Sequence, residues 1–341
     1  TAQLSRLALS APEYLAWRSR VTARQDLEGK LAAVRYDGLE RVNPDYLEQR
    51  SSVQAGETVD NARISAEARQ ISALQEFESV GYRLEGDLEQ PTLVWLPKEK
   101  SWGPHYLNFD LGMYASDDGD LAFVIYAKHS RTWLNRFGGE WRNELQLGYE
   151  SLLTSSFYQP LDVAQRYFVE PRVGWWRTFE DIFDDGERLA TYQFDNWGGG
   201  LDAGMNIGNQ AQLRIGYLFT RRRVDLATGS ALLPAGLNDD AGLVASATYD
   251  SRDTAFNATS GMAVALEYLQ SDESLGASRD WKRIEGGLGW ALPISKDVVW
   301  LTMAGGSNLG SELPADRTFM IGGPGSFPGY EIGEVRADQY W

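Results

Sequence analysis

The sequence predicts a mainly β protein, in which a small mixed α/β unit precedes a large antiparallel sheet of the outer-membrane barrel type. Beyond Trp102, short segments alternate apolar and polar residues, as in residues 212–220, and helical periodicity disappears. No run approaches the roughly 18 apolar residues that a membrane helix needs. The 35 glycines, 12 tryptophans and 16 tyrosines suit barrel turns and interfacial aromatic girdles.

The composition excludes several classes of function. The formal net charge is −16, which argues against nucleic acid as a partner because phosphate backbones need basic surfaces. A chain without cysteine has no disulfide scaffold, zinc-thiolate site or cysteine nucleophile. Only His105 and His129 are available as catalytic histidines, each near the end of a predicted strand, and no Gly-x-Ser-x-Gly elbow occurs. We therefore expect no enzyme activity in this chain, no cofactor and no metal site.

The first 29 residues are predicted to form a helical tether to an upstream domain, because Tyr14, Trp17 and Val21 have helical spacing. A helix that caps the following domain is the alternative, and the pattern leaves both open.

Residues 30–101 predict a small domain with the order β-α-α-β-β. A strand is expected near residues 31–36, and Asn43-Pro44 indicates a helix start. Ile64 and Ile71 lie on the apolar stripe of a second helix. Two strands follow, near residues 77–84 and 92–96. The last two strands would leave an edge free to pair with an extended peptide.

Residues 102–341 are expected to form about twelve strands. They are placed near residues 104–114, 119–129, 140–150, 165–177, 188–196, 199–207, 211–222, 241–251, 261–270, 281–292, 297–305 and 332–341. The run Gly198-Gly199-Gly200 is interpreted as a hairpin turn between two of them. If the small domain is periplasmic, the longer loops 151–164, 222–240 and 305–331 fall outside the cell. The tight turns 206–210 and 293–297 then fall inside.

A long connection before the last predicted strand is rich in glycine and proline. Four glycines and two prolines within residues 319–330 predict a rigid, tightly turned loop. On the pattern alone, the loop either folds back into a lumen or lies on the surface.

Two motifs of this region carry a resemblance to a known family. The loop residues resemble the lumenal loop of the BamA/TpsB superfamily of outer-membrane insertases and secretion pores; they are Gly322, Gly323, Phe327, Pro328, Gly329 and Tyr330. A second motif resembles the family's turn before a mid-barrel strand; its residues are Asp250, Arg252, Asp253 and Gly261. The β-α-α-β-β unit resembles a POTRA domain. The whole is most similar to the translocator half of patatin-like autotransporters of the PlpD kind (type V secretion, subclass d).

The resemblance implies an outer-membrane translocator of a Gram-negative bacterium, with its POTRA domain in the periplasm. It would export or display a passenger fused in cis, a patatin-like lipase upstream of Thr1. The implied partners are outer-membrane lipids and lipopolysaccharide, the outer-membrane assembly machinery and, in a homodimer, a second copy. Family barrels have about sixteen strands, so the C-terminal strands are expected to be missing here. A passive outer-membrane pore or lipid transporter, or a soluble all-β binding protein or glycosidase, are the alternatives.

Two features depart from or add to this pattern. The family usually has arginine where this chain has Pro328, so the family's ion pair to the inner wall cannot form, and the anchoring of the loop stays open. Arg221, Arg222 and Arg223 lie at the outer end of a predicted strand. They are candidates for contact with lipopolysaccharide phosphates, since arginine forms bidentate pairs with phosphate. A solvated strand end is the alternative.

Overall fold

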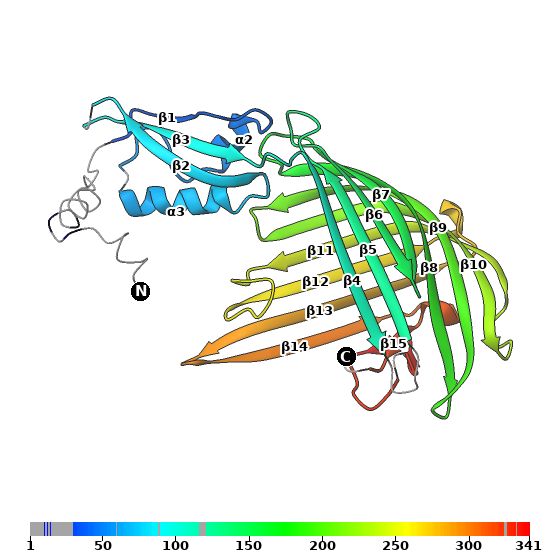
Figure 1. The fold of residues 1–341 in the computed structure, drawn as a ribbon. Coiled ribbons are helices and arrows are strands. Elements are labelled where there is room, and N and C mark those ends of the chain that lie inside the picture. Colours follow the sequence, from blue (N-terminus) through cyan, green and yellow to red (C-terminus); the bar gives the residue numbers. More distant parts are fainter. Residues whose placement is uncertain are drawn as a thin grey trace. The chain divides into compact units, whose positions relative to one another are not determined.

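The chain divides into two compact units, Thr1–Ser101 and Trp102–Trp341 (Figure 1). The computed structural model describes residues 10, 12, 14, 30–58, 60–87, 89–115, 121–323, 326–331 and 333–341. Apart from residues 10, 12 and 14, the predicted tether lies outside these residues. Within the described residues, no helix is both long and apolar enough to cross a bilayer.

The first unit has the predicted order of elements. They are β1 (Ala33–Tyr36), α2 (Pro44–Arg50), α3 (Asn61–Ser72), β2 (Phe77–Glu85) and β3 (Thr92–Glu99). The Asn43 side chain caps α2 by accepting the Asp45 N–H, and Pro44 begins the helix as predicted. Strand β3 lies in the centre, parallel to β1 and antiparallel to β2. The long free edge of this three-stranded sheet is therefore β2.

A buried carboxylate ties β3 of the first unit to the turn before α2. The Glu99 side chain is 7% exposed and its Oε2 lies 2.8 Å from the Arg41 Nε. Its Oε1 accepts the backbone N–H groups of Glu40, Arg41 and Val42 at 3.0–3.1 Å. Burial alone would raise the pKa of Glu99, but the N–H groups of Val42 and Arg41 and the Arg41 guanidinium outweigh it and hold that pKa below its ordinary value of 4.5.

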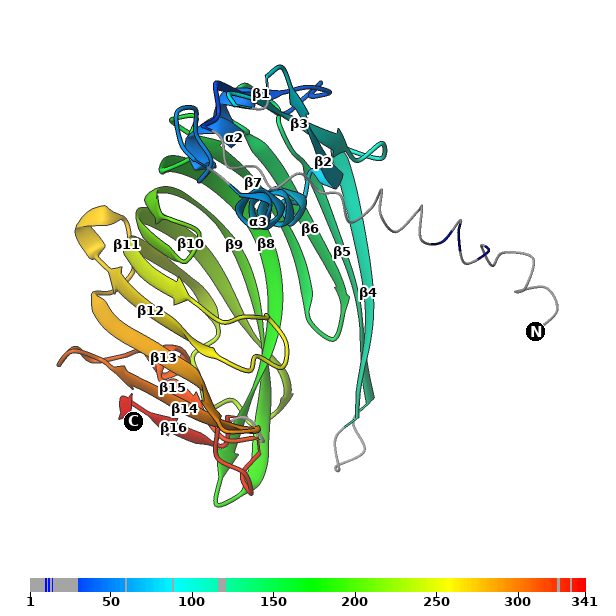
Figure 2. The ribbon, with the colours of Figure 1, turned by 90° about the vertical axis from the view of Figure 1, so that its left-hand side faces the viewer.

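The second unit is built on one antiparallel sheet of twelve strands, which curves around a concave face (Figure 2). In chain order the strands are β4 (His105–Ala115), β5 (Leu121–Arg131), β6 (Glu140–Gly148), β7 (Ser151–Pro160), β8 (Tyr167–Asp184), β9 (Glu187–Ile207), β10 (Ala211–Gly229), β11 (Gly236–Asp250), β12 (Gly261–Ser271), β13 (Trp281–Ile294), β14 (Asp297–Ser307) and β17 (Gln339–Tyr340). Strands β15 (Phe319–Ile321) and β16 (Val335–Ala337) form a separate pair within the long connection 308–338. We call the end of the sheet where β4 begins the proximal end and the opposite end the distal end.

The strand number agrees with the prediction, but two of the predicted boundaries are wrong. Residues 151–160, predicted as a loop, form β7, which pairs with β6 and β8. Residues 188–196 and 199–207, predicted as two strands, are the single strand β9. The two errors cancel, so the connections 230–235 and 308–338 still share the distal end, while 208–210 and 295–296 share the proximal end. Of the predicted strand 332–341, only β17 joins the large sheet.

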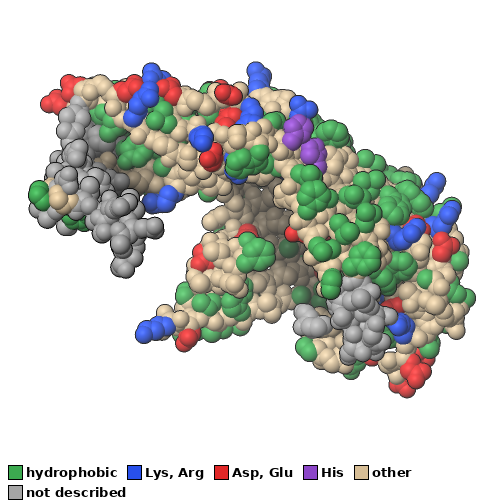
Figure 3. Space-filling model, viewed as in Figure 1, with side chains coloured by type: hydrophobic (Ala, Val, Ile, Leu, Met, Phe, Trp, Pro, Cys, Tyr) green, Lys and Arg blue, Asp and Glu red, His purple; other side chains and the backbone are tan. Residues whose placement is uncertain are grey.

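The two faces of this sheet differ in chemistry, as the alternating pattern predicts. On β4, the side chains of Leu107, Phe109, Leu111 and Met113 are 57–77% exposed on the convex face. Figure 3 shows hydrophobic side chains spread over this outer surface, and a hollow behind its front strands. The apolar side chains thus lie on the convex face, away from the concave face, as in a barrel wall that faces lipid.

Glycines on the concave face make room for large neighbouring side chains. A Cβ on Gly200 would lie 2.7 Å from the Tyr217 carbonyl oxygen and 3.2 Å from the Arg172 Nε. Gly198 would approach the Trp176 ring to 3.1 Å. The run Gly198-Gly199-Gly200 therefore lies in the middle of β9, paired with β8 and β10, and its interpretation as a hairpin turn is wrong. Glycine there permits the close approach of neighbouring carbonyl oxygens and side chains, and does not serve chain reversal.

Two glycines of the concave face give a matched test of this packing. A Cβ on Gly216 would lie 2.6 Å from the Leu201 carbonyl oxygen and 3.0 Å from the Asp202 Cα, whereas nothing lies within 4 Å of a Cβ on Gly289. We expect Gly216→Ala to destabilise the folded chain by about 1–3 kcal/mol and Gly289→Ala to be nearly neutral. Urea denaturation in detergent, followed by tryptophan fluorescence, measures the difference; equal midpoints for the two variants would contradict the packing role.

The Glu99 contacts predict a pH dependence of the first unit. Because the folded-state pKa of Glu99 lies below its unfolded value, its stabilisation is present above about pH 4.5 and is lost as the pH falls through the folded pKa. We expect Glu99→Gln to cost about 2 kcal/mol at pH 7 and progressively less below pH 4.5. Hydrogen exchange of the β3 amides in the full chain, measured from pH 3 to 7, tests this. A cost that stays constant across that range would rule out the proposed linkage.

Candidate functional site

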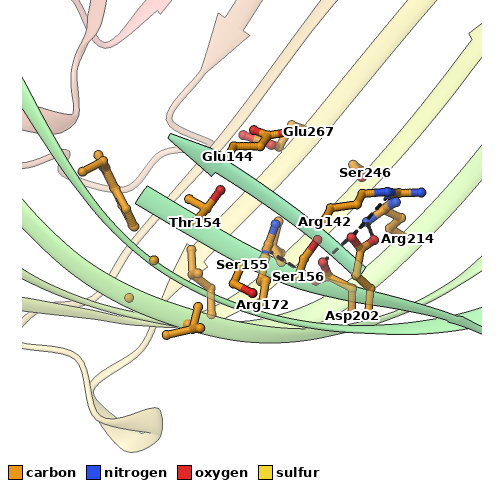
Figure 4. Close-up of a pocket in the computed structure, with 18 of the residues that line it drawn as sticks. Arg142, Glu144, Thr154, Ser155, Ser156, Arg172, Asp202, Arg214, Ser246 and Glu267 are labelled. Atoms are coloured by element: carbon orange, nitrogen blue, oxygen red, sulfur yellow. Dashed lines mark hydrogen bonds and ion pairs between the residues drawn. The ribbon is translucent and has the colours of Figure 1, made fainter. Parts of the chain in front are cut away.

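Arginine and carboxylate side chains from β6, β8, β9 and β10 meet on the concave face, beside a cavity of about 530 Å³ (Figure 4). The Arg214 Nη1 lies 2.7 Å from Glu170 Oε2 and 3.7 Å from Asp202 Oδ2. The Arg142 Nη1 lies 3.6 Å from Glu170 Oε1, and the Arg172 Nη2 lies 3.4 Å from Asp202 Oδ1. We call these five residues the wall cluster.

The wall cluster is a network of buried charge. Glu170 and Asp202 are 6% and 2% exposed, so each carboxylate depends on the arginines for solvation. The Arg142 guanidinium lies over the Tyr158 ring, with 5.0 Å from Cζ to the ring centroid, and Arg142 also pairs with Glu140 at 2.7 Å. Removing one partner from such a buried pair costs on the order of 3–5 kcal/mol, because the other charge stays buried. The cluster therefore fixes the relative positions of four strands.

The connection 308–338 returns onto the concave face near the distal end and is held there by three ion pairs. Asp316 pairs with Arg222 of β10, and Arg317 pairs with Asp240 of β11. The Arg336 Nη2 lies 3.2 Å from Glu180 Oε2 of β8. Asp316, Arg317 and Arg336 of the connection thus each meet an opposite charge of the wall. We call residues 313–319 and 335–340 the base of the loop.

An apolar contact supports the same base. Trp281, Leu313 and Phe319 form a buried cluster, against which Tyr340 packs with 5.2 Å between the Phe319 and Tyr340 ring centroids. The Tyr340 hydroxyl donates to Glu285 Oε1 at 2.8 Å, and the Arg283 Cζ lies 4.7 Å from the Phe319 ring centroid. The base is therefore fixed by charge and by burial together.

The predicted glycine motif forms the tip of this loop. Gly322, Gly323 and Gly329 have φ values of +136°, +85° and +104°, a left-handed region that favours glycine. The Gly323 N–H donates to the Tyr330 carbonyl oxygen at 2.8 Å, which closes the turn. The rings of Phe327 and Tyr330 pack together with centroids 5.2 Å apart, and both side chains are exposed. The tip is thus a tight turn that sits on an anchored base.

Pro328 does not leave the loop without attachment to the wall, although the sequence left that attachment open. The loop is attached to the wall through Asp316, Arg317 and Arg336, which flank the motif and were not singled out in the sequence. Each of the three partners lies on another strand, 77 to 156 positions away along the chain. No local spacing could have indicated these pairs.

The three consecutive arginines lie within the distal half of β10, which continues to Gly229, and not at the strand end as predicted; they do not act as one cluster. Arg222 is 5% exposed and points to the concave face, where it also donates from Nε to Asn196 Oδ1 at 3.0 Å. It is therefore not available to lipopolysaccharide, because successive residues of a strand face opposite sides. Arg221 and Arg223 are exposed on the other face, and Arg221 forms a bidentate pair with Asp239, with both distances 2.8 Å.

The second predicted motif forms the proximal turn between β11 and β12. Arg252 pairs with Asp250 at 2.7 Å, and Gly261 has φ +95°. Asp253 accepts the Thr259 hydroxyl and the N–H groups of Thr254 and Thr259, and the Thr259 hydroxyl is the main cause of its lowered pKa. These contacts are all internal to the turn, so its residues hold its shape.

Comparisons with known proteins agree with this geometry. The Omp85 superfamily domain matches residues 135–340, which is more than half of the chain. BamA from Haemophilus ducreyi lacking POTRA domains 1–3 superposes with a TM-score of 0.63 at 13% identity, over 89% of this chain and 60% of that one. CdiB from Escherichia coli superposes with a TM-score of 0.53 at 12% identity, over 92% of this chain and 60% of that one. CdiB from Acinetobacter baumannii superposes with a TM-score of 0.55 at 10% identity, over 92% of this chain and 59% of that one. A search of curated proteins found no match.

The fold thus defines the class of protein as one built on a large antiparallel sheet of the BamA type. The chain belongs to the Omp85 superfamily. It spans about three fifths of the length of the solved structures that it resembles.

The ion pairs of the base predict how the loop responds to a single change. Arg317→Gln leaves Asp240 with a weaker partner, because Arg222 Nη2 lies 3.5 Å from it. We expect backbone amides of residues 313–320 to exchange about tenfold to hundredfold faster, since a lost charged hydrogen bond costs roughly 1.5–3 kcal/mol. Mass spectrometry of exchanged peptides measures this, with Arg279→Gln, on an exposed connection, as the control. Equal exchange in the two variants would contradict the anchoring role of Arg317.

Proposed function

We propose that this chain is the membrane-embedded translocator part of a patatin-like autotransporter of the PlpD kind. In this proposal it inserts into the outer membrane and exports or displays a passenger fused in cis, a patatin-like lipase upstream of Thr1. The observation that carries the proposal is a polar concave wall with a loop held against it by ion pairs from three different strands. A polar wall of this kind offers a route to a hydrated polypeptide, while the apolar convex face meets lipid.

The first unit supplies the second part of the mechanism. Strand β2 is a nine-residue edge of its sheet, and an extended segment can add to such an edge through main-chain hydrogen bonds. We propose that this unit is a periplasmic POTRA domain that captures the passenger or a strand of the barrel in this way. This mode of capture does not require a particular passenger sequence, because the hydrogen bonds are made by backbone groups.

The surroundings of the barrel follow from its faces and edges. We propose that Arg221 and Arg223, without Arg222, contact lipopolysaccharide phosphates at the distal end. We also propose that the sheet closes through further strands, because unpaired backbone groups at the edges of β4 and β14 are costly in lipid. Assembly into the membrane would use the outer-membrane assembly machinery, and a homodimer remains part of the proposal.

Passenger export tests the proposal at the tip of the loop. Gly323→Val and Gly329→Val force a β-branched residue into a left-handed backbone conformation. We expect each variant to reduce surface display of a fused passenger at least tenfold. A tenfold reduction corresponds to a loss of about 1.4 kcal/mol in the free energy of the export step. Gly289→Ala serves as the control. Protease accessibility of the passenger on whole cells provides the measurement. Normal display in both valine variants would contradict the proposed role of the loop in export.

A passive pore is separated from a translocator by planar-bilayer conductance. A translocator whose lumen holds the loop should show a small, fluctuating conductance that changes when residues 30–101 are deleted. A large, stable and ion-selective conductance that is insensitive to this deletion would favour the pore and contradict the proposal.

A further inference from the structure

The only two histidines of the chain, far apart in the sequence, meet on the sheet. His105 begins β4, and His129 lies near the end of β5, one diagonal step away, because Leu107 pairs with His129 and His105 pairs with Arg131. The His105 Nδ1 and His129 Nε2 are 3.1 Å apart. Figure 3 shows the two imidazoles adjoining one another beside the hydrophobic outer surface. The residues are 24 positions apart, and the hairpin of β4 and β5 brings them together.

The rings meet end to end. Their centroids are 5.4 Å apart and their planes differ by 23°, so with nitrogens 3.1 Å apart the rings lie almost in line and in one plane. The Asn143 Nδ2 lies 3.3 Å from the other nitrogen of His129, Nδ1, and the Trp141 ring stands edge-on to His129. The Asn143 amide holds the His129 ring, and the nitrogen of His129 that carries the proton depends on which amide atom faces Nδ1. His129 is thereby oriented toward His105.

We propose that His105 and His129 form a two-histidine site for a divalent transition-metal ion. Two imidazole nitrogens bound to one metal at 2.0–2.1 Å lie about 2.9 Å apart at a right angle and about 3.3 Å apart at a tetrahedral angle. The separation of 3.1 Å lies between these values. Tilting the rings toward solvent aims both lone pairs at one point, and the exposed position of His105 permits that tilt.

The amide of Asn143 suits the second coordination shell. When His129 binds through Nε2, its proton moves to Nδ1 and needs an acceptor. Rotating the Asn143 amide by 180° presents Oδ1 in place of Nδ2, which is the carbonyl acceptor that metal-bound histidines commonly have. The described residues contain no group of three or more His, Asp or Glu side chains placed to hold a metal ion. Water therefore completes the coordination at this exposed position.

The charges nearby set the choice of metal. Arg131 lies opposite His105 in the register, and its positive charge opposes binding of any cation. Two neutral imidazoles without a carboxylate favour a borderline ion, with Cu²⁺ bound more tightly than Ni²⁺ or Zn²⁺. Removing the arginine charge should therefore strengthen binding.

The position of the site gives it a structural role. Within the described sheet, β4 has a neighbouring strand on one side only, which is β5. A metal ion held by His105 and His129 joins these two strands at the proximal end. The ion would thus act as a clip between β4 and β5 at the proximal end of the sheet.

Titration of the untagged full chain in detergent with Cu²⁺ tests the site, because no other imidazole and no thiol is present in the chain. Electron paramagnetic resonance should show one Cu²⁺ per chain with hyperfine splitting from two nitrogens. His105→Gln and His129→Gln should each lose one nitrogen and at least tenfold in affinity, and Arg131→Gln should bind severalfold more tightly. Unchanged splitting and affinity in the double variant, or a wild-type spectrum without two nitrogens, would overturn the site.

Hydrogen exchange of the β4 amides tests the clip with Zn²⁺, which is diamagnetic. Exchange in the wild type should slow at least threefold on adding Zn²⁺, and the His129→Gln variant should show no change. The heat-dependent gel mobility of each variant checks that it has folded. Equal exchange with and without Zn²⁺ in the wild type would overturn the clip.

Discussion

The two-residue repeat of a β-strand is the constraint on which the second unit depends. Twelve paired strands satisfy their backbone groups within the sheet, and each successive side chain then takes the opposite face. Because the convex face is largely apolar, the charges that alternate with its apolar residues are directed to the concave face, where they need partners. Arg222 shows the effect of the alternation, since it is buried among charges of the concave face while its neighbours Arg221 and Arg223 are exposed on the other face.

Charge pairing on the concave face does two tasks with one kind of interaction. In the wall cluster, Glu170 accepts from Arg214 of a strand that lies two places away in the sheet, so the pair holds side chains across β9. Nearer the distal end, Asp240 and Glu180 use the same chemistry to hold the connection 308–338. Glycines of the neighbouring strands make this pairing possible, because Gly216 leaves space for the Asp202 carboxylate.

The alternating pattern predicted the fold because period and turn chemistry are local properties. Asn43-Pro44 fixed the start of α2, and the alternation at residues 212–220 fixed β10. Strand β7 was missed because Thr154, Ser155 and Ser156 break the apolar alternation, and their burial depends on the neighbouring strands. The ion pairs of the loop base could not be predicted, since their partners become neighbours only when the sheet has formed.

The loop separates an anchored base from a turned tip, and Pro328 belongs to the tip. The ion pairs of Asp316, Arg317 and Arg336 lie outside the glycine motif, so arginine is not required at position 328 to hold the loop on the wall. At the tip, Tyr330 lines a hollow of about 410 Å³ with residues of the β8–β9 hairpin and β16. A rearrangement of the tip can therefore occur without breaking the buried charges of the base, whose loss would cost several kcal/mol.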